Sequence, residues 1–177
     1  SNTDQETGSV QTNLGFGYVI FHIPHSSIEI PESVRDQFLL DDSALNDELI
    51  KMTDRWTYEL ISGYSLSSVI VNSPVSRLVV DVERFYDDSQ EIMASIGMGA
   101  FYTATHRLGL LRRPISAAER QLILDTWYHP HHEKLTDAVE IALQQHGKAL
   151  IFDIHSYPRQ TLPYEINGDG KRHEICI

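Results

Sequence analysis

The chain has 177 residues, the length of one globular domain, and 41% of them are hydrophobic, which is ordinary for a folded soluble protein. The formal net charge of −11 argues against a nucleic-acid partner, because such proteins need clustered Lys and Arg to neutralise phosphates. Apolar runs are too short for a membrane helix, the start does not resemble a signal peptide, and the single Cys176 excludes an internal disulfide. We therefore expect a cytoplasmic protein whose metal ligands, if any, are histidines and carboxylates.

The first elements predicted along the chain follow a polar lead, residues 1–16, which we expect to be flexible. Aromatic and β-branched residues over 17–23 predict a buried strand that ends at Pro24-His25-Ser26. A short helical turn is expected within 31–38. Apolar residues at helical intervals then predict a helix over 47–61.

Two further strands are predicted over 67–72 and 77–82, the second ending in Glu83-Arg84, and a glycine-bearing loop follows. Ser116 and Glu119 form a capping-box pattern, which opens a helix expected to run towards Gln145, with a possible break at Pro130. Gly147 is the expected stop.

A near-continuous apolar run over 149–154 predicts a central strand covered on both faces, and the alternation of strands and helices predicts an α/β layered domain. Two strands end directly in His-Ser, at His25-Ser26 and at His155-Ser156. Because reactive groups in open α/β sheets collect beyond the carboxyl ends of the strands, this shared placement predicts a site there.

Two histidines and one carboxylate are a common ligand set for catalytic zinc, which keeps one position open for water. His25 and His155 are the candidate histidines, and Asp54 and Glu29 are rival carboxylates that spacing alone does not separate. The alternative for each histidine is a partly buried, hydrogen-bonded ring, and for Asp54 an ordinary exposed helix carboxylate.

Five segments in order resemble the N-formylglutamate amidohydrolase family, and the likeness spans roughly residues 18–177. They are Ile-Pro-His-Ser-Ser at 23–27, Thr-Asp-Arg-Trp at 53–56, Ser-Arg-Leu-Val-Val-Asp at 76–81, Tyr-His-Pro-His-His-Glu-Lys-Leu at 128–135 and Phe-Asp-Ile-His-Ser at 152–156. The resemblance implies one α/β hydrolase domain over 17–177, a three-layer sandwich around a mixed, largely parallel sheet, similar to zinc carboxypeptidases. It also implies one zinc ion, or another divalent metal, held by His25, Asp54 and His155, and so favours Asp54 over Glu29.

Arginine is suited to a substrate carboxylate because its guanidinium donates two parallel hydrogen bonds. Arg77 and Arg84 are the candidates for this contact, and the alternative makes both of them salt-bridge partners of nearby aspartates. The family usually has Asn-Arg where this chain has Glu83-Arg84, a departure that bears on the substrate.

The remaining candidates surround the histidine at the end of the last strand. Ser156 and Tyr157 are expected to contact substrate, as is one of His129 and His132, because adjacent helical residues point in different directions. Asp153, two residues before His155, is expected either to orient that ring or to be a structural acid.

The implied reaction is metal-assisted hydrolysis of an N-acyl amino acid such as N-formyl-L-glutamate, by a monomer or small homo-oligomer. Family members generally extend beyond the end of this sequence, where 174–177 resembles the start of a strand, so the base glutamate of the related peptidases has no clear match. Glu165 is the stand-in candidate. The alternatives are a carboxypeptidase-like or other N-acyl-amino-acid hydrolase, and a catalytically silent binding domain with the same fold.

Overall fold

The computed structural model of the chain describes residues 17–63, 68–165 and 173–175. The predicted flexible lead, residues 1–16, lies outside this described part. In chain order the elements are β1 (Val19–Ile23), α1 (Glu32–Arg35), α2 (Asp42–Met52), α3 (Thr57–Ser62), β2 (Val69–Asn72), η1 (Ile92–Ile96), α4 (Ala117–Ile123), η2 (Leu124–Tyr128), α5 (His129–His146) and β3 (Leu150–Asp153).

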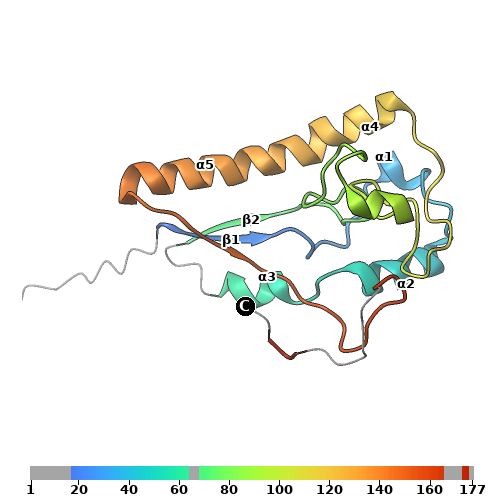
Figure 1. Ribbon diagram of the computed structural model, residues 1–177, viewed down its shortest axis with the longest axis horizontal. Helices are drawn as coiled ribbons and strands as arrows, with labels where there is room; N and C mark the ends of the chain where they lie inside the picture. The colour runs from blue at the N-terminus through green and yellow to red at the C-terminus, as the bar shows by residue number, and fades with distance from the viewer. Residues whose placement is uncertain (1–16, 64–67, 166–172, 176–177) are drawn as a thin grey trace, which may run out of the picture.

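The described strands form one parallel sheet in the order β2-β1-β3, which confirms an α/β protein with a parallel sheet. Figure 1 shows α5 along one side of this sheet and α2 and α3 on the other. Ile20 and Val71 of the sheet pack with Ala138 and Ala142 of α5 in one apolar cluster. The predicted three-layer sandwich is consistent with helices on both sides and otherwise stays a prediction.

The last strand, β3, does not have the predicted central position. It lies at the edge of the described sheet, next to β1, and all four of its residues are exposed. The apolar run over 149–154 correctly predicted a strand but not its neighbours, because strand order depends on pairing between distant segments. Glu174 and Ile175 form no strand, and the other two residues of the predicted 174–177 strand lie outside the described residues.

The predicted strand over 77–82 is absent, and this segment consists of turns. Leu78, Val79 and Val80 are almost fully buried in the larger apolar core, so the apolar run reflects burial. The backbone hydrogen bonds of the segment are local or go to a loop: Val79 N–H donates to Ser76 O, and Asp81 N–H to Ala100 O.

The predicted helix over 47–61 is two helices, α2 and α3, separated by residues 53–56. The amide of Asp54 donates to the carbonyl of His25, outside the helix, and Trp56 has φ 70°, a left-handed conformation that ends a regular helix. The interruption therefore brings Asp54 to the end of β1.

The predicted helix over 116–145 forms as a continuous rod of α4, η2 and α5 (Figure 1). The capping box is confirmed, because Ser116 accepts from the Glu119 amide and Glu119 accepts from the Ser116 amide. The irregular turn is not at Pro130, which lies in the first turn of α5, but in the π-helical segment η2 just before it. Gly147 ends the rod at φ 68°, as predicted.

Candidate metal centre

Three side chains from separate parts of the chain meet beyond the carboxyl ends of β1 and β3. His25 follows β1, His155 follows β3, and Asp54 lies between α2 and α3. One possible ligand atom from each lies within 4.8 Å of the other two, so the three could hold a metal ion. The structure thus brings together the three predicted ligands, whereas Glu29 is exposed and belongs to none of the candidate metal groups among the described residues.

The His25 ring is held from one side only. Its Nε2 lies 2.9 Å from Asp81 Oδ1, while its buried Nδ1 has no hydrogen-bond partner in the described part of the chain and lies 3.7 Å from Asp54 Oδ2. A metal-binding histidine commonly donates its other ring nitrogen to a carboxylate, which fixes the tautomer. The unpartnered Nδ1 facing Asp54 therefore fits a metal ligand, and Asp81 fits the orienting carboxylate.

Asp81 is fully buried and joins several groups behind the site. Its Oδ2 accepts hydrogen bonds from Arg77 Nη2 at 2.7 Å and from the Tyr102 hydroxyl at 2.9 Å, and its Oδ1 also accepts from the Glu83 amide. Burial opposes the charge on Asp81, but Arg77 and then His25 outweigh it, so the pKa of Asp81 lies well below its usual range. The carboxylate stays ionised and can hold the His25 ring.

The electrostatics around the other two candidate ligands favour a cation between them. Hydrogen bonding to Asp153, then to Asp54 and Glu83, raises the pKa of His155 to about 12. Burial alone would raise the pKa of Asp54, but the hydrogen bond to His155, together with the nearby His25 and Arg77, lowers it to about 2. Asp54 Oδ2 lies 2.9 Å from His155 Nδ1, so a positive charge, proton or metal ion, is stabilised at this position.

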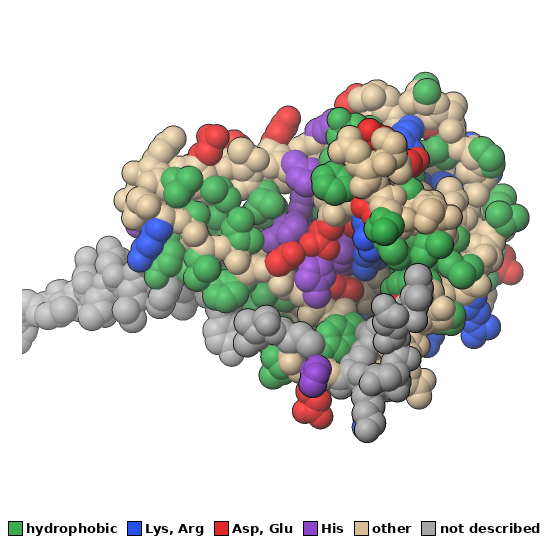
Figure 2. Space-filling model, viewed as in Figure 1, with side chains coloured by type: hydrophobic (Ala, Val, Ile, Leu, Met, Phe, Trp, Pro, Cys, Tyr) green, Lys and Arg blue, Asp and Glu red, His purple; other side chains and the backbone are tan. Residues whose placement is uncertain are grey.

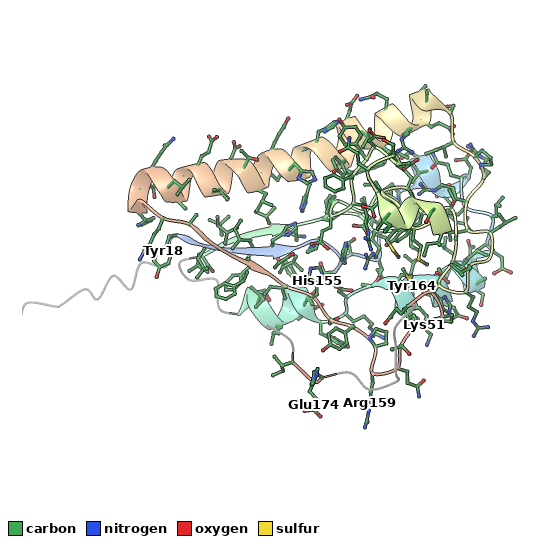
Figure 3. The ribbon with its side chains drawn as sticks, viewed as in Figure 1. Tyr18, Lys51, His155, Arg159, Tyr164 and Glu174 are labelled. Atoms are coloured by element: carbon green, nitrogen blue, oxygen red, sulfur yellow. The ribbon has the colours of Figure 1, made fainter. Side chains whose placement is uncertain are left out.

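A pocket of about 210 Å³ opens beside these groups and is lined by Asp54, Arg77, His155 and several predicted substrate or catalytic residues. Those are Ser156, Tyr157 and Glu165. Figure 3 shows His155 where the chain leaves β3, with Lys51 of α2 and Tyr164 to one side of it. Lys51 and Tyr164 also line the pocket, and the sequence pattern gave no signal for either.

The other predicted substrate residues do not line this pocket. Arg84 forms the ion pair weighed as its alternative, because its Nε lies 3.9 Å from Asp81 Oδ2, and its Nη1 also lies 3.4 Å from Glu91 Oε1. His129 packs edge-on against Tyr86, and the His132 ring lies 4.5 Å from the Tyr128 ring centre. Their roles in substrate binding stay predictions.

Asp153 contacts two histidines at once. Its Oδ1 lies 2.8 Å from His22 Nδ1, and its Oδ2 lies 3.3 Å from His155 Nε2. The contact with His155 is the one expected of an orienting acid, and Asp153 is half exposed rather than a buried structural acid. The contact with His22, which is paired with Asp153 in the β1–β3 register, was not predicted.

The fold and this site together define an α/β protein with a histidine–carboxylate cluster suited to a divalent metal ion. The sequence profile described as N-formylglutamate amidohydrolase matches residues 17–177. The chain belongs to the N-formylglutamate amidohydrolase family.

Individual relatives agree with this assignment. The chain is 28% identical over 156 residues to an N-formylglutamate deformylase of Pseudomonas putida, covering 85% of this chain and 55% of the relative. A crystal structure of an N-formylglutamate amidohydrolase from Ralstonia eutropha superposes with TM-score 0.70 at 20% identity, covering 80% of this chain and 54% of that one. The structure of a gene product from Agrobacterium tumefaciens gives TM-score 0.62 at 19% identity, covering 81% and 53%.

The chain thus spans about half the length of the relatives it matches. None of the helices in the described part of the chain has the length and apolar character needed to cross a bilayer.

Proposed function

We propose that this chain carries the metal site of a hydrolase that cleaves the amide bond of an N-acyl amino acid such as N-formyl-L-glutamate, releasing formate and glutamate. The proposal rests on one observation: His25, Asp54 and His155 converge beside a pocket, where the buried Nδ1 of His25 has no hydrogen-bond partner among the described residues and Asp81 holds its Nε2. The family and the names of the relatives support the choice of substrate.

Zinc is the ion that two histidines and one carboxylate favour, and cobalt or iron fit the same ligands. When bound, the ion supplies Lewis acidity, which polarises the acyl oxygen of the substrate and makes a nearby water more acidic. Asp81 keeps the His25 ring in the tautomer whose Nδ1 is free to bind, and Arg77 fixes Asp81 through two hydrogen bonds.

The pocket supplies the groups that bind the substrate. N-formylglutamate carries two carboxylates, and Lys51 and Arg77 are cationic residues on the pocket wall. Ser156 and Tyr157 add polar groups beside His155. Glu165 lines the same pocket, where its carboxylate is the candidate base that takes the proton of the attacking water and delivers it to the leaving amine.

The test is formate release from N-formyl-L-glutamate by the purified chain, measured together with its metal content. We expect His25→Ala and Asp54→Asn to bind one equivalent of metal fewer than the unaltered chain and to lose at least 100-fold of the turnover, because each removes a ligand of this ion. His146→Ala is a matched control, since His146 lies in the last turn of α5 and belongs to none of the candidate metal groups among the described residues.

The other outcomes separate the alternatives. Metal binding with cleavage of peptides instead of N-formylglutamate would move the assignment to a carboxypeptidase-like hydrolase. A chain with neither metal nor turnover would contradict the proposal and favour a binding domain.

A further inference from the structure

A second group of possible ligands adjoins the candidate metal centre. His22, Glu83 and Asp153 each present a ligand atom within 4.8 Å of the other two, and none of the three is among the predicted ligands of the first ion. Figure 2 shows histidine and acidic side chains together on this face, beneath α5. We infer that His22, Glu83 and Asp153 bind a second divalent metal ion next to the first.

The His22 ring is fixed so that one nitrogen faces the two carboxylates. It is buried on β1, and its Nε2 lies 2.8 Å from Nε2 of the buried His131 on α5. Its Nδ1 lies 2.8 Å from Asp153 Oδ1, since residues 22 and 153 are partners in the parallel register. When His22 Nε2–H donates to His131, the Nδ1 lone pair points to Asp153, the arrangement that a metal ligand with an orienting partner requires.

Glu83 lies between the two ligand groups. One carboxylate oxygen lies 3.4 Å from His25 Nε2, and the other lies 3.3 Å from His155 Nε2. The carboxylate therefore adjoins both histidines of the first group while remaining within reach of His22 and Asp153.

The number of protons available to the carboxylates of Glu83 and Asp153 also favours a second cation. This argument rests on the proposed first ion being bound to His155. A neutral His155 that binds the first ion through Nδ1 keeps a single N–H, at Nε2. That N–H faces two carboxylates, because Glu83 Oε1 and Asp153 Oδ2 each lie 3.3 Å away. One N–H cannot neutralise two adjacent carboxylates, whereas a divalent ion shared with His22 can.

The ligand chemistry matches a transition metal rather than calcium or magnesium. One imidazole nitrogen and two carboxylates suit zinc, cobalt or manganese, while calcium and magnesium prefer oxygen ligands alone. Asp153 and Glu83 are partly exposed, which leaves the second site open to solvent on one side.

The test counts metal ions. The metal-free chain is titrated with Co²⁺ and, separately, with Zn²⁺ by calorimetry, and bound metal is measured after gel filtration. We expect two equivalents for the unaltered chain and for the control His146→Ala. We expect one equivalent for His22→Ala and a second-site affinity at least tenfold weaker for Glu83→Gln, a variant that keeps the side-chain volume if loss of His22 perturbs the fold.

Each contrary result has a distinct meaning. One equivalent in the unaltered chain, with formate still released, overturns the second site and leaves the proposed function standing. Two tightly bound equivalents in both His22→Ala and Glu83→Gln overturn the location. No bound metal in the unaltered chain contradicts both proposals.

Discussion

Asp81 is the residue on which the geometry of the candidate centre depends most. It is completely buried, and its two oxygens bind His25, Arg77, Tyr102 and the amide of Glu83. A carboxylate behind a metal-binding histidine typically contributes 10- to 100-fold to metal affinity, because it fixes the ring and raises its basicity.

We therefore expect Asp81→Asn to weaken zinc binding by about 10- to 100-fold, measured by competition with a chelator. The same change leaves the buried Arg77 without its counter-charge, so the free energy of unfolding should fall by about 3–5 kcal/mol in urea denaturation. Tyr102→Phe, which removes one hydrogen bond to the ionised Asp81 and keeps the charge, should cost about 1.5–3 kcal/mol. Unchanged metal affinity in Asp81→Asn would show that His25 is oriented by other groups.

The sequence pointed to His25 and His155, and the family resemblance favoured Asp54 over Glu29, but of the residues that contact these ligands only Asp153 was predicted and Asp81 was not. His25 and His155 follow apolar runs, and this placement is visible in the sequence. The pairing of His22 with His131 joins residues 109 positions apart, and it depends on how α5 packs over β1. The residues around His22 and His131 in the sequence do not predict this contact, because either histidine could equally well occupy an ordinary position in the core.

At the scale of elements, apolar patterns in the sequence predicted which segments are buried better than they predicted which segments pair through backbone hydrogen bonds. The runs predicted over 17–23 and 67–72 contain strands, at Val19–Ile23 and Val69–Asn72, whereas the equally apolar 77–82 is buried without pairing. The helical periodicity of apolar residues over 47–61 continues across the interruption at 53–56. It gives no sign of the interruption, because the hydrogen bond from the Asp54 amide to the His25 carbonyl involves only backbone atoms. The candidate ligand Asp54 lies at the point where the helical periodicity fails to predict the structure.

The capping box of α4 provides a pH-dependent contribution to stability. Hydrogen bonding to Arg113, followed by the Ser116 amide, lowers the pKa of Glu119 to about 2. A carboxylate with a lowered pKa stabilises the fold above its unfolded pKa of 4.5, and this stabilisation is lost as the pH falls through 2. We expect Glu119→Gln to reduce the free energy of unfolding by a constant amount above pH 5, and the difference from the unaltered chain to shrink between pH 4.5 and 2.

Urea denaturation at pH 7, 4 and 3 checks this expectation, with Glu133→Gln as the control because Glu133 is an exposed acid in α5, outside the capping box. A difference that stays the same at pH 3 would place the effect of Glu119 in helix propensity instead of charge.

At the scale of the whole molecule, we expect the proposed first metal ion to link segments that lie far apart along the chain. Its candidate ligands follow β1, α2 and β3, so binding joins segments that are up to 130 residues apart, between His25 and His155. A ligand that binds only the folded state at 100 times its dissociation constant stabilises that state by about 2.7 kcal/mol.

We expect zinc at that excess to raise the melting temperature of the metal-free chain by several degrees, and a chelator to reverse the shift, measured by circular dichroism. His25→Ala should show a clearly smaller zinc-dependent shift, because it loses the first site and keeps only the second proposed site. A shift of equal size in His25→Ala would place the stabilising ion elsewhere.

The position of β3 at the edge of the described sheet has a consequence for the exchange of backbone amide hydrogens with deuterated water. The Leu150 amide donates to the carbonyl of Tyr18, just before β1, and the Ile154 amide to that of His22 in β1, and in a parallel strand alternate amides face the same side. The amides of Ile151 and Asp153 therefore point away from β1, and their hydrogens should exchange much faster than that of Phe152. An intact strand would thus show a two-residue alternation of protection, which nuclear magnetic resonance can detect residue by residue.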